Sequence, residues 1–202
     1  MSHYFVNDNK VKSNKRNLYY KYGDTSFTFV SDNGVFSKNE IDEGSEALLN
    51  NYLKSGISGR TLDVGSGVGL LGIVISKIND CEVDMLEVNS RAVELCKENI
   101  KINSASKCFV YESDVYEKAT GKYDVVISNP PIRAGKKVVF EILEKAYDYL
   151  NDDGELWVVV RKSHGADSCK NKMIDVFGNC DIIKRDKGFY TLKSKKKEGF
   201  NE

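Results

Sequence analysis

From residue 60 to residue 195, segments typical of buried strands alternate with segments that have helical periodicity. The strand segments are 60–64, 82–88, 107–113, 123–129 and 154–161, followed by two strands within 181–195 around a Lys187–Gly188 turn. The helical segments are 69–79, 89–103, 134–150 and 166–178. Repeated strand–helix units predict an α/β fold: a mainly parallel, seven-stranded sheet with helices on both faces.

The residues before this region predict a small β element and one further helix. Two alternating aromatic runs flank a Gly-Asp turn within 19–30, which indicates a β-hairpin. Ser37 followed by Glu40 fits a capping box for the next helix, although Gly44 interrupts the apolar pattern and favours a later start. We expect an N-terminal β extension over 1–36, a main domain over 37–197 and a tail over 198–202.

Composition narrows the class of protein. The chain has 202 residues, with 41% apolar and 30% charged residues, which is typical of one soluble domain of ordinary to large size. No apolar run approaches the roughly 18 residues that would span a bilayer. The first 16 residues contain no apolar core of a secretory signal. We therefore expect a cytoplasmic protein without a membrane partner.

Cysteine and histidine usage argues against disulfides and metals. The five cysteines are odd in number and form no C-x-x-C pair, which favours reduced thiols packed in the core. The two histidines are too few for a histidine-based metal cluster and argue against a histidine-based catalytic triad. We expect no metal site.

Positive charge concentrates in two segments of a chain whose formal net charge is zero. Residues 10–21 carry basic side chains and no acid, and residues 184–197 carry basic side chains against the single acid Asp186. Two interpretations stand side by side: a basic face that contacts a polyanion, or two solvated ends of the chain.

A glycine-rich loop follows the first strand of the alternating region. Residues 63–72 read DVGSGVGLLG, and glycines there allow a tight turn and a close approach of the backbone to a ligand. Gly67, Gly69 and Gly72 satisfy the G-x-G-x-x-G dinucleotide pattern. Gly65, Gly67 and Gly69, with Asp63 ahead of them, fit the D-x-G-x-G-x-G loop of S-adenosylmethionine enzymes. An ordinary strand–helix turn seldom needs three alternating glycines.

Two acids follow the next two strands. Glu87 could accept hydrogen bonds from ribose hydroxyls with either cofactor, or be a surface carboxylate. Asp114 stands where a carboxylate could accept from an adenine amino group, or cap the next turn. Because parallel strands end at the same edge of a sheet, both acids should lie near the glycine loop.

The fourth strand ends in SNPPIRAGK, residues 128–136, which contain both prolines of the chain. Pro130 and Pro131 predict a rigid loop, since proline fixes φ and cannot donate to a sheet. Beside a sulfonium methyl donor, the Asn129 side-chain oxygen and the Pro130 carbonyl could each accept one N–H of an exocyclic amine. They would direct its lone pair and offset its growing positive charge. A stiff turn is the structural alternative.

In this order and spacing, DVGSGVG, LEVN, SDV and SNPPIRAGK resemble the class I S-adenosylmethionine-dependent methyltransferases. With GVFS and D-x-G-[ST] upstream, the chain is most similar to the small-domain group of the 16S ribosomal RNA guanine-N2 methyltransferases. The likeness extends over about residues 10–195. It implies a Rossmann-like methyltransferase fold, S-adenosylmethionine as cofactor, and RNA as partner, namely 16S ribosomal RNA or the small ribosomal subunit.

The resemblance also implies roles for individual residues. Those expected at the cofactor are Asp63, Gly65, Gly67, Gly69, Glu87, Asn89, Asp114 and Asn129. Those expected at the reacting amine are Asn129, Pro130, Pro131 and Ile132. Those expected at RNA are Phe36, Arg133, Lys136 and Lys137, although a core position suits Phe36 equally and the start of a solvated helix suits the basic residues.

Two departures from the family pattern bear on how the substrate is bound. Many enzymes with this loop have an aromatic residue after the second proline, to stack on an extruded base, where this chain has Ile132. Phe36 is a candidate substitute. Longer members of the group also carry an additional N-terminal domain.

Other functions are compatible with parts of the pattern. They are methylation of a protein glutamine by a release-factor-type enzyme, methylation of adenine N6, a nicotinamide oxidoreductase, and an RNA-binding module without catalysis. The oxidoreductase would leave the Asn-Pro-Pro loop without a purpose. A module without catalysis would not need the intact glycine loop and Asn129.

Overall fold

The computed structural model describes residues 11–197. Its strands are β1 (Arg16–Tyr22), β2 (Thr25–Ser31), β3 (Thr61–Val64), β4 (Val83–Glu87), β5 (Cys108–Glu112), β6 (Tyr123–Ser128), β7 (Leu150–Arg161), β8 (Asp181–Asp186) and β9 (Phe189–Lys195). Its helices are α1 (Glu43–Lys54), α2 (Leu70–Asn79), α3 (Ser90–Ile102), α4 (Lys136–Tyr149) and α5 (Ala166–Phe177), with short 3-10 helices η1 (Ile132–Ala134) and η2 (Lys162–His164). The predicted tail, 198–202, and residues 1–10 of the predicted extension lie outside the described residues.

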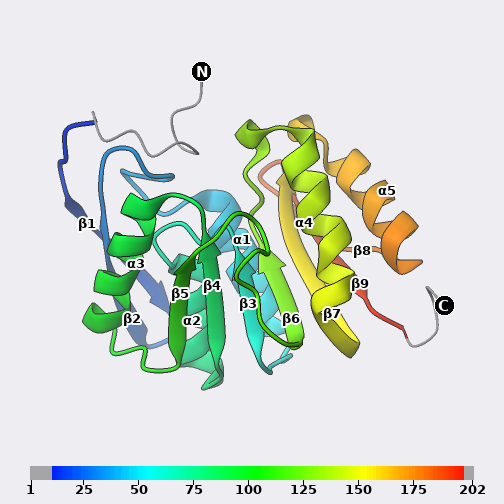
Figure 1. Ribbon diagram of the computed structural model, residues 1–202, viewed down its shortest axis with the longest axis horizontal. Coiled ribbons are helices and arrows are strands. Elements are labelled where there is room, and N and C mark those ends of the chain that lie inside the picture. Colours follow the sequence, from blue (N-terminus) through cyan, green and yellow to red (C-terminus); the bar gives the residue numbers. More distant parts are fainter. Residues whose placement is uncertain (1–10, 198–202) are drawn as a thin grey trace.

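The main sheet has seven strands in the order β5-β4-β3-β6-β7-β9-β8 (Figure 1). The pairs from β5 to β7 are parallel, and β9 pairs antiparallel with both β7 and β8. This arrangement confirms the predicted fold class. It also places the ends of β3, β4 and β6 at one edge of the sheet, because neighbouring parallel strands run in the same direction.

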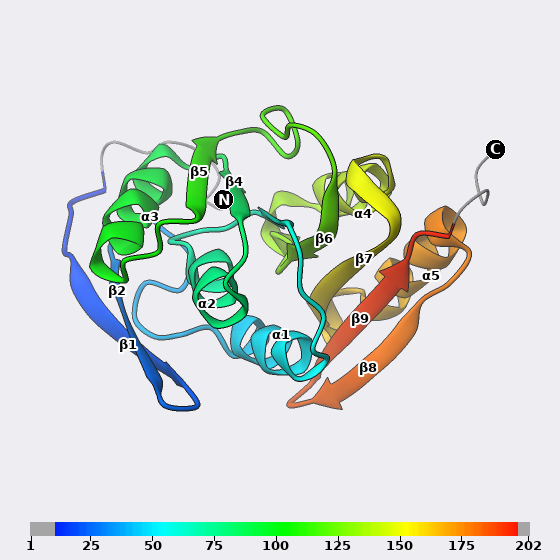
Figure 2. The same cartoon turned by 90° about the horizontal axis from the view of Figure 1, so that it is seen from below.

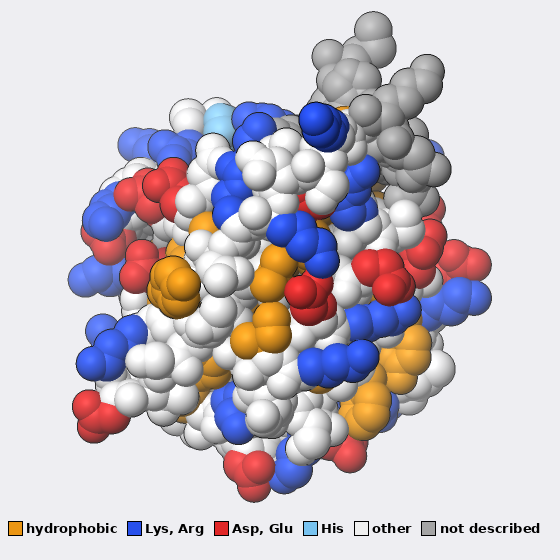
Figure 3. Space-filling model, turned by 90° about the vertical axis from the view of Figure 1, so that its left-hand side faces the viewer, with side chains coloured by type: hydrophobic (Ala, Val, Ile, Leu, Met, Phe, Trp, Pro, Cys, Tyr) orange, Lys and Arg blue, Asp and Glu red, His pale blue; other side chains and the backbone are white. Residues whose placement is uncertain are grey.

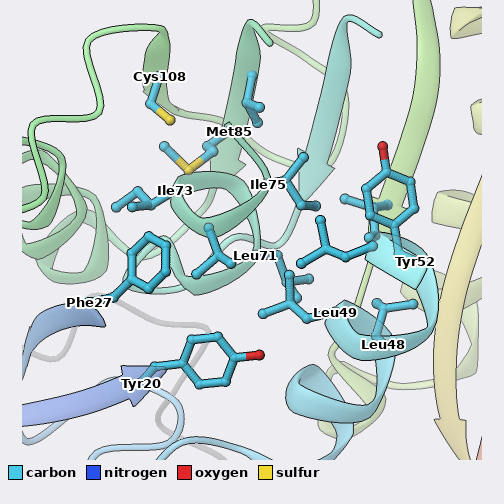
Figure 4. Close-up of a cluster of buried hydrophobic side chains, with 14 of the residues drawn as sticks. Tyr20, Phe27, Leu48, Leu49, Tyr52, Leu71, Ile73, Ile75, Met85 and Cys108 are labelled. Carbon is cyan, nitrogen blue, oxygen red and sulfur yellow. The ribbon is translucent and has the colours of Figure 1, made fainter. Parts of the chain in front are cut away.

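Helices cover both faces of the main sheet (Figures 1 and 2). Side chains along β6 alternate between the faces: Val125 and Ile127 pack in one buried cluster, and Val126 packs in the other. The first cluster includes side chains from α1, α2 and the N-terminal hairpin, and Figure 4 shows part of it. The second includes side chains from α4 and α5. Burial of apolar area on both faces therefore holds the parallel strands in place.

The N-terminal hairpin forms as predicted, and its two strands pair antiparallel as a separate sheet. Phe27 and Phe29 are buried in the first core cluster. The buried Asn99 of α3 accepts a hydrogen bond from the Val30 amide at 2.7 Å and donates to the Val30 carbonyl at 3.0 Å and to the Val68 carbonyl at 2.9 Å. One side chain thus connects the hairpin, α3 and the loop before α2.

The predicted capping box at the start of α1 is wrong. Ser37 has a positive φ of 54°, and its hydroxyl donates to the Glu40 carbonyl in a turn before the helix. The helix begins after Asp42, whose carboxylate accepts from the Ser45 amide at 2.7 Å. Asp42 is a better cap because it places an anion at the positive end of the helix dipole.

The starts of α3 and β7 can also be compared with the starts predicted from the sequence. Asn89 caps α3 as predicted, since its side chain accepts from the Arg91 and Ala92 amides. Strand β7 begins at Leu150, earlier than predicted, because Leu150 already pairs with Tyr123 of β6. Leu150 is buried there.

The two basic segments lie on opposite sides of the molecule: β1 is at one side of Figure 1, and β8 and β9 are towards the other. On the side seen in Figure 3, Lys and Arg side chains are interspersed with Asp and Glu side chains. Lys15 pairs with Glu98 at 2.7 Å, and Lys195 pairs with Asp153 at 2.9 Å. These segments therefore do not form one continuous basic face.

All five cysteines are free, and Cys96, Cys108 and Cys169 are buried. Of the helices in the described part of the chain, none has the length and apolar character needed to cross a membrane.

We expect Asn99→Ala to lower the free energy of unfolding by about 3 kcal/mol, because three hydrogen bonds disappear and buried backbone groups lose their partners. Urea denaturation followed by circular dichroism measures this change. Lys101→Ala, on an exposed position of the same helix, should stay within about 0.5 kcal/mol of the wild type. Equal stabilities of the two variants would show that Asn99 does not fasten the hairpin.

Candidate active site

A cavity of about 1120 Å³ opens where β3, β4 and β6 end. The start of α1, the end of β7 and the start of β9 complete its wall. It brings together most of the residues predicted from the sequence: Phe36, Gly65, Gly67, Glu87, Asn89, Asp114, Asn129, Pro130, Pro131, Ile132 and Arg133. Ligand sites in proteins commonly have about 300–1,000 Å³, so a nucleoside-sized cofactor and a second group fit this space.

The glycine loop is held against β4 by backbone hydrogen bonds. The Gly65 and Ser66 amides both donate to the Leu86 carbonyl, at 2.8 and 3.0 Å. Gly65 and Gly67 have positive φ angles of 77° and 56°, which other residues rarely adopt. The loop therefore turns back on itself, and at Gly65 and Gly67 it presents backbone to the cavity without a side chain.

Glu87 connects the end of β4 to this loop. Its Oε2 accepts from the Gly67 amide at 2.8 Å and its Oε1 accepts from the Asn89 amide at 2.9 Å. Burial raises the pKa of Glu87, and the hydrogen bonds from Asn89 and Gly67 oppose that rise. Each carboxylate oxygen keeps a second lone pair that can accept from a ligand. Glu87 is thus not the surface carboxylate of the alternative interpretation.

Asp63 lies beneath the glycine loop and not in the cavity wall. It is fully buried, and its Oδ2 accepts from the Gly72 amide at 3.1 Å. Its Oδ1 is buried without a hydrogen-bond partner. Burial raises the pKa of Asp63 to about 7, and the nearby charge of Glu87 adds to the rise. Asp63 therefore supports the loop from below, and its expected contact with a cofactor stays a prediction.

Gly69 is also absent from the cavity wall. It precedes α2 with a φ of 93°, and a side-chain carbon there would lie 2.6 Å from the Cys96 Sγ. Packing against α3 therefore accounts for this glycine.

The Asn-Pro-Pro loop has its own internal hydrogen bonds. The Pro130 carbonyl accepts from the Ile132 amide at 2.8 Å, and the Pro131 carbonyl accepts from the Ala134 amide at 2.9 Å. A carbonyl oxygen has two lone pairs, so Pro130 can still accept from a ligand. The rigidity predicted from the two prolines is reinforced by these bonds.

The Asn129 side chain is oriented by α1. Its Nδ2 donates to the Asp42 Oδ2 at 2.8 Å and to the Ser45 Oγ at 2.9 Å. Both amide hydrogens are therefore used, and the Oδ1 is the atom that remains to accept. Asp42 and Ser45 also line the cavity, and we did not predict either as a site residue. The D-x-G-[ST] stretch is the sequence signal that could have indicated them.

The predicted RNA-contacting residues divide into two groups. Phe36 is 54% exposed and lines the cavity, so the core interpretation of this residue is wrong. Arg133 also lines the cavity. Lys136 and Lys137 begin α4 outside it, and the Lys136 ammonium lies 4.8 Å from the centre of the Phe140 ring.

Within residues 11–197, no group of three or more His, Cys, Asp and Glu side chains is placed to hold a metal ion. The polar groups of the cavity include backbone amides, carboxylates and one oriented amide. They are suited to hydrogen bonding of a nucleoside and an amine.

Comparison with known proteins identifies the family. Residues 26–193 match the methyltransferase small domain model, and the chain belongs to this family. It is 40% identical over 197 residues to the uncharacterized protein YbxB of Bacillus subtilis (strain 168), with 96% of this chain and 98% of that protein covered.

It is also 37% identical over 142 residues to ribosomal RNA small subunit methyltransferase C of Aeromonas hydrophila, with 68% of this chain and 41% of that protein covered. Among solved structures, the T. thermophilus 16S rRNA N2 G1207 methyltransferase, in complex with AdoMet and guanosine, superposes with a TM-score of 0.83 at 23% identity. That match covers 91% of this chain and 51% of the other. The chain thus spans about half the length of these two named methyltransferases.

These matches confirm the predicted class I, S-adenosylmethionine-dependent methyltransferase. They favour this interpretation of the glycine loop over a nicotinamide oxidoreductase.

Asp63 should make the stability of the protein fall as pH rises from about 4 to about 7. Its pKa is raised from 3.8 to about 7 in the folded state, so in this window the unfolded chain loses the proton and the folded chain keeps it. Below this window both states are protonated and above it both are ionised.

Asp63→Asn removes this titration. We expect the stability difference, variant minus wild type, to grow between pH 4 and pH 7 and then to level off. Chemical denaturation at a series of pH values measures it. A difference independent of pH would contradict the buried, protonated carboxyl group.

Proposed function

We propose that this protein transfers a methyl group from S-adenosylmethionine to the exocyclic N2 amine of guanine in 16S ribosomal RNA of the small subunit. The observation that carries the proposal is the Asn129 amide, whose two N–H groups are bound by Asp42 and Ser45. This leaves its oxygen available to accept, and Asn129 lines the same cavity as the glycine loop. The similarity to ribosomal RNA small subunit methyltransferase C supports the RNA substrate.

The glycine loop and the two acids fit the cofactor. Bound S-adenosylmethionine supplies a methyl group on a positively charged sulfonium. Gly65 and Gly67 allow close approach of its methionine end, with Asp63 supporting the loop. Glu87 keeps lone pairs for ribose hydroxyls, and the exposed Asp114 carboxylate is available to the adenine amino group. Gly69 and Asn89 shape the starts of α2 and α3 beside these groups.

Asn129 and Pro130 prepare the target nitrogen. A base amine is a poor nucleophile because its lone pair is delocalised into the ring. The Asn129 Oδ1 and the Pro130 carbonyl each accept one N–H, which favours a tetrahedral nitrogen and directs its lone pair towards the methyl group. Both oxygens stabilise the positive charge that develops on the nitrogen. No general base is needed for the transfer, since the cationic product readily loses a proton to water.

Six further side chains suit an RNA substrate with an extruded base. Phe36 supplies an exposed aromatic ring, which is the stacking surface that Ile132 lacks. Ile132 and Pro131 form an apolar wall. Arg133 at the cavity, with Lys136 and Lys137 at the start of α4, supplies positive charge for phosphates. Such an enzyme would act in the cytoplasm, where ribosomal subunits assemble.

Labelled methyl transfer tests the proposal. The protein is incubated with methyl-labelled S-adenosylmethionine and small ribosomal subunits from cells that lack this gene, and the products are digested and identified. We expect label in N2-methylguanosine. Label in N6-methyladenosine or in protein would reject the guanine substrate but keep the methyltransferase. The absence of both label and cofactor binding would reject the proposed function.

Asn129→Ala should lower kcat by about 10²–10³-fold, as removal of one group that stabilises transition-state charge commonly does. The affinity for S-adenosylmethionine should change little. Single-turnover kinetics and calorimetry measure the two quantities. Asn151→Ala, which removes an asparagine bonded to Asp124 outside the cavity, is the control and should keep kcat. A parallel loss of binding and turnover would contradict the assigned role.

Phe36→Leu should raise KM for RNA about 10-fold, since stacking of a base on an aromatic side chain contributes roughly 1–3 kcal/mol. Phe36→Tyr should restore most of the affinity. Tyr19→Leu is a matched control, because Tyr19 is 72% exposed on the hairpin and does not line the cavity. If Leu and Tyr at position 36 give the same KM, the ring does not stack on a base.

A further inference from the structure

We propose that Asp42 is a positioning residue for methyl transfer: its carboxylate fixes which end of the Asn129 amide faces the substrate. This inference rests on the proposed function of Asn129 as the acceptor for the target amine. Asp42 and Asn129 are separated by 87 residues in the chain, and their side chains meet at 2.8 Å.

The geometry of the three side chains leaves one orientation of the amide. The Asn129 Nδ2 lies between the Asp42 Oδ2 at 2.8 Å and the Ser45 Oγ at 2.9 Å, so each of its two hydrogens has an acceptor. An amide turned by 180° would place its oxygen beside the Asp42 carboxylate. Ionised carboxylates only accept hydrogen bonds, so that orientation brings two acceptors together and is disfavoured. The Ser45 hydroxyl alone could not select this orientation of the amide, because a hydroxyl can also donate a hydrogen bond to the amide oxygen.

The same contact strengthens the Asn129 oxygen as an acceptor. A hydrogen bond to a charged group polarises the donor amide, and the effect is larger in a partly buried site. Electron density moves towards the Oδ1, where positive charge on the target nitrogen would be stabilised. Asp42 thus acts on the reaction through Asn129, without contacting the reacting atoms.

Gly44 makes room for this arrangement. A side-chain carbon at Gly44 would lie 2.9 Å from the Phe189 Cε1 and 3.1 Å from the Asp42 Oδ2. A glycine inside a helix lowers stability by roughly 0.5–1 kcal/mol relative to alanine. Gly44 nevertheless occupies the buried first turn of α1. Its absence of a side chain lets α1 approach Phe189 while the carboxylate keeps its position beside Asn129.

A purely structural role of Asp42 is the competing explanation, because this residue also caps α1 by accepting from the Ser45 amide at 2.7 Å. Helix capping requires only that contact. Loss of the cap would lower the stability of the fold, and it would not lower kcat separately from the affinity for the cofactor. The two explanations therefore differ in their kinetic consequences.

Asp42→Asn separates them. The same Asp42 Oδ2 accepts from the Ser45 amide and from the Asn129 Nδ2, so an asparagine oxygen at this place can keep both bonds. The variant therefore keeps the cap and removes the negative charge that polarises the Asn129 amide. We expect kcat for methyl transfer to RNA to fall about 10-fold or more, with the affinity for S-adenosylmethionine and the melting temperature nearly unchanged. In an Asn129→Ala background, Asp42→Asn should have no additional effect on kcat. An unchanged kcat in the single variant, or the same fold-loss in both backgrounds, would overturn the proposal.

A second readout does not depend on activity. The side-chain ¹⁵N–H₂ resonances of Asn129, assigned by their absence in Asn129→Ala, report its hydrogen bonds directly. We expect them to shift in Asp42→Asn and in Ser45→Ala, whose Asp42 cap is retained. Unchanged resonances would overturn the proposal even in an active enzyme. If the two variants show these shifts but the wild-type protein transfers no methyl group, the proposed function is rejected instead.

Discussion

The parallel pairing of β3 between β4 and β6 determines where every part of the site lies. Thr61, Leu62 and Asp63 pair with residues of both neighbours, so the three strands run side by side and end together. The glycine loop and Asn129 directly follow β3 and β6, and Glu87 is the last residue of β4. Segments far apart in the sequence thus face one cavity, and the apolar clusters on both faces of the sheet maintain that alignment.

Carboxylates placed next to each loop then fix its conformation. Glu87 holds the Gly67 amide, Asp63 holds the start of α2 through the Gly72 amide, and Asp42 holds the Asn129 side chain. Bonds from amide donors to ionised carboxylates are among the stronger hydrogen bonds in proteins, and a buried carboxyl group such as Asp63 still accepts when it is protonated. The site is therefore organised before a ligand arrives, which reduces the cost of positioning two reactants.

The sequence was sufficient for those features that depend on local patterns. Strand–helix alternation predicts the order of elements, and the glycine and Asn-Pro-Pro loops predict the edge of the sheet that binds ligands. The predicted start of α1 was wrong because Ser37 and Asp42 both resemble helix caps locally. Only Asp42 caps the helix, and it also contacts Asn129, which is distant in the sequence. The contact of Asp42 with Asn129 and the burial of Asp63 depend on packing between distant segments, which local patterns do not encode. Phe36 was ambiguous for the same reason.

An NMR titration of ¹⁵N-labelled protein with S-adenosylhomocysteine, the demethylated cofactor, tests most directly whether the two loops form one site. We expect the largest shifts at the backbone amides of Gly65, Gly67 and Asn89, with a smaller change at Asn129. Shifts confined to other surfaces, or no shifts at saturating concentrations, would contradict the convergence of the glycine and Asn-Pro-Pro loops on a methyl-donor site.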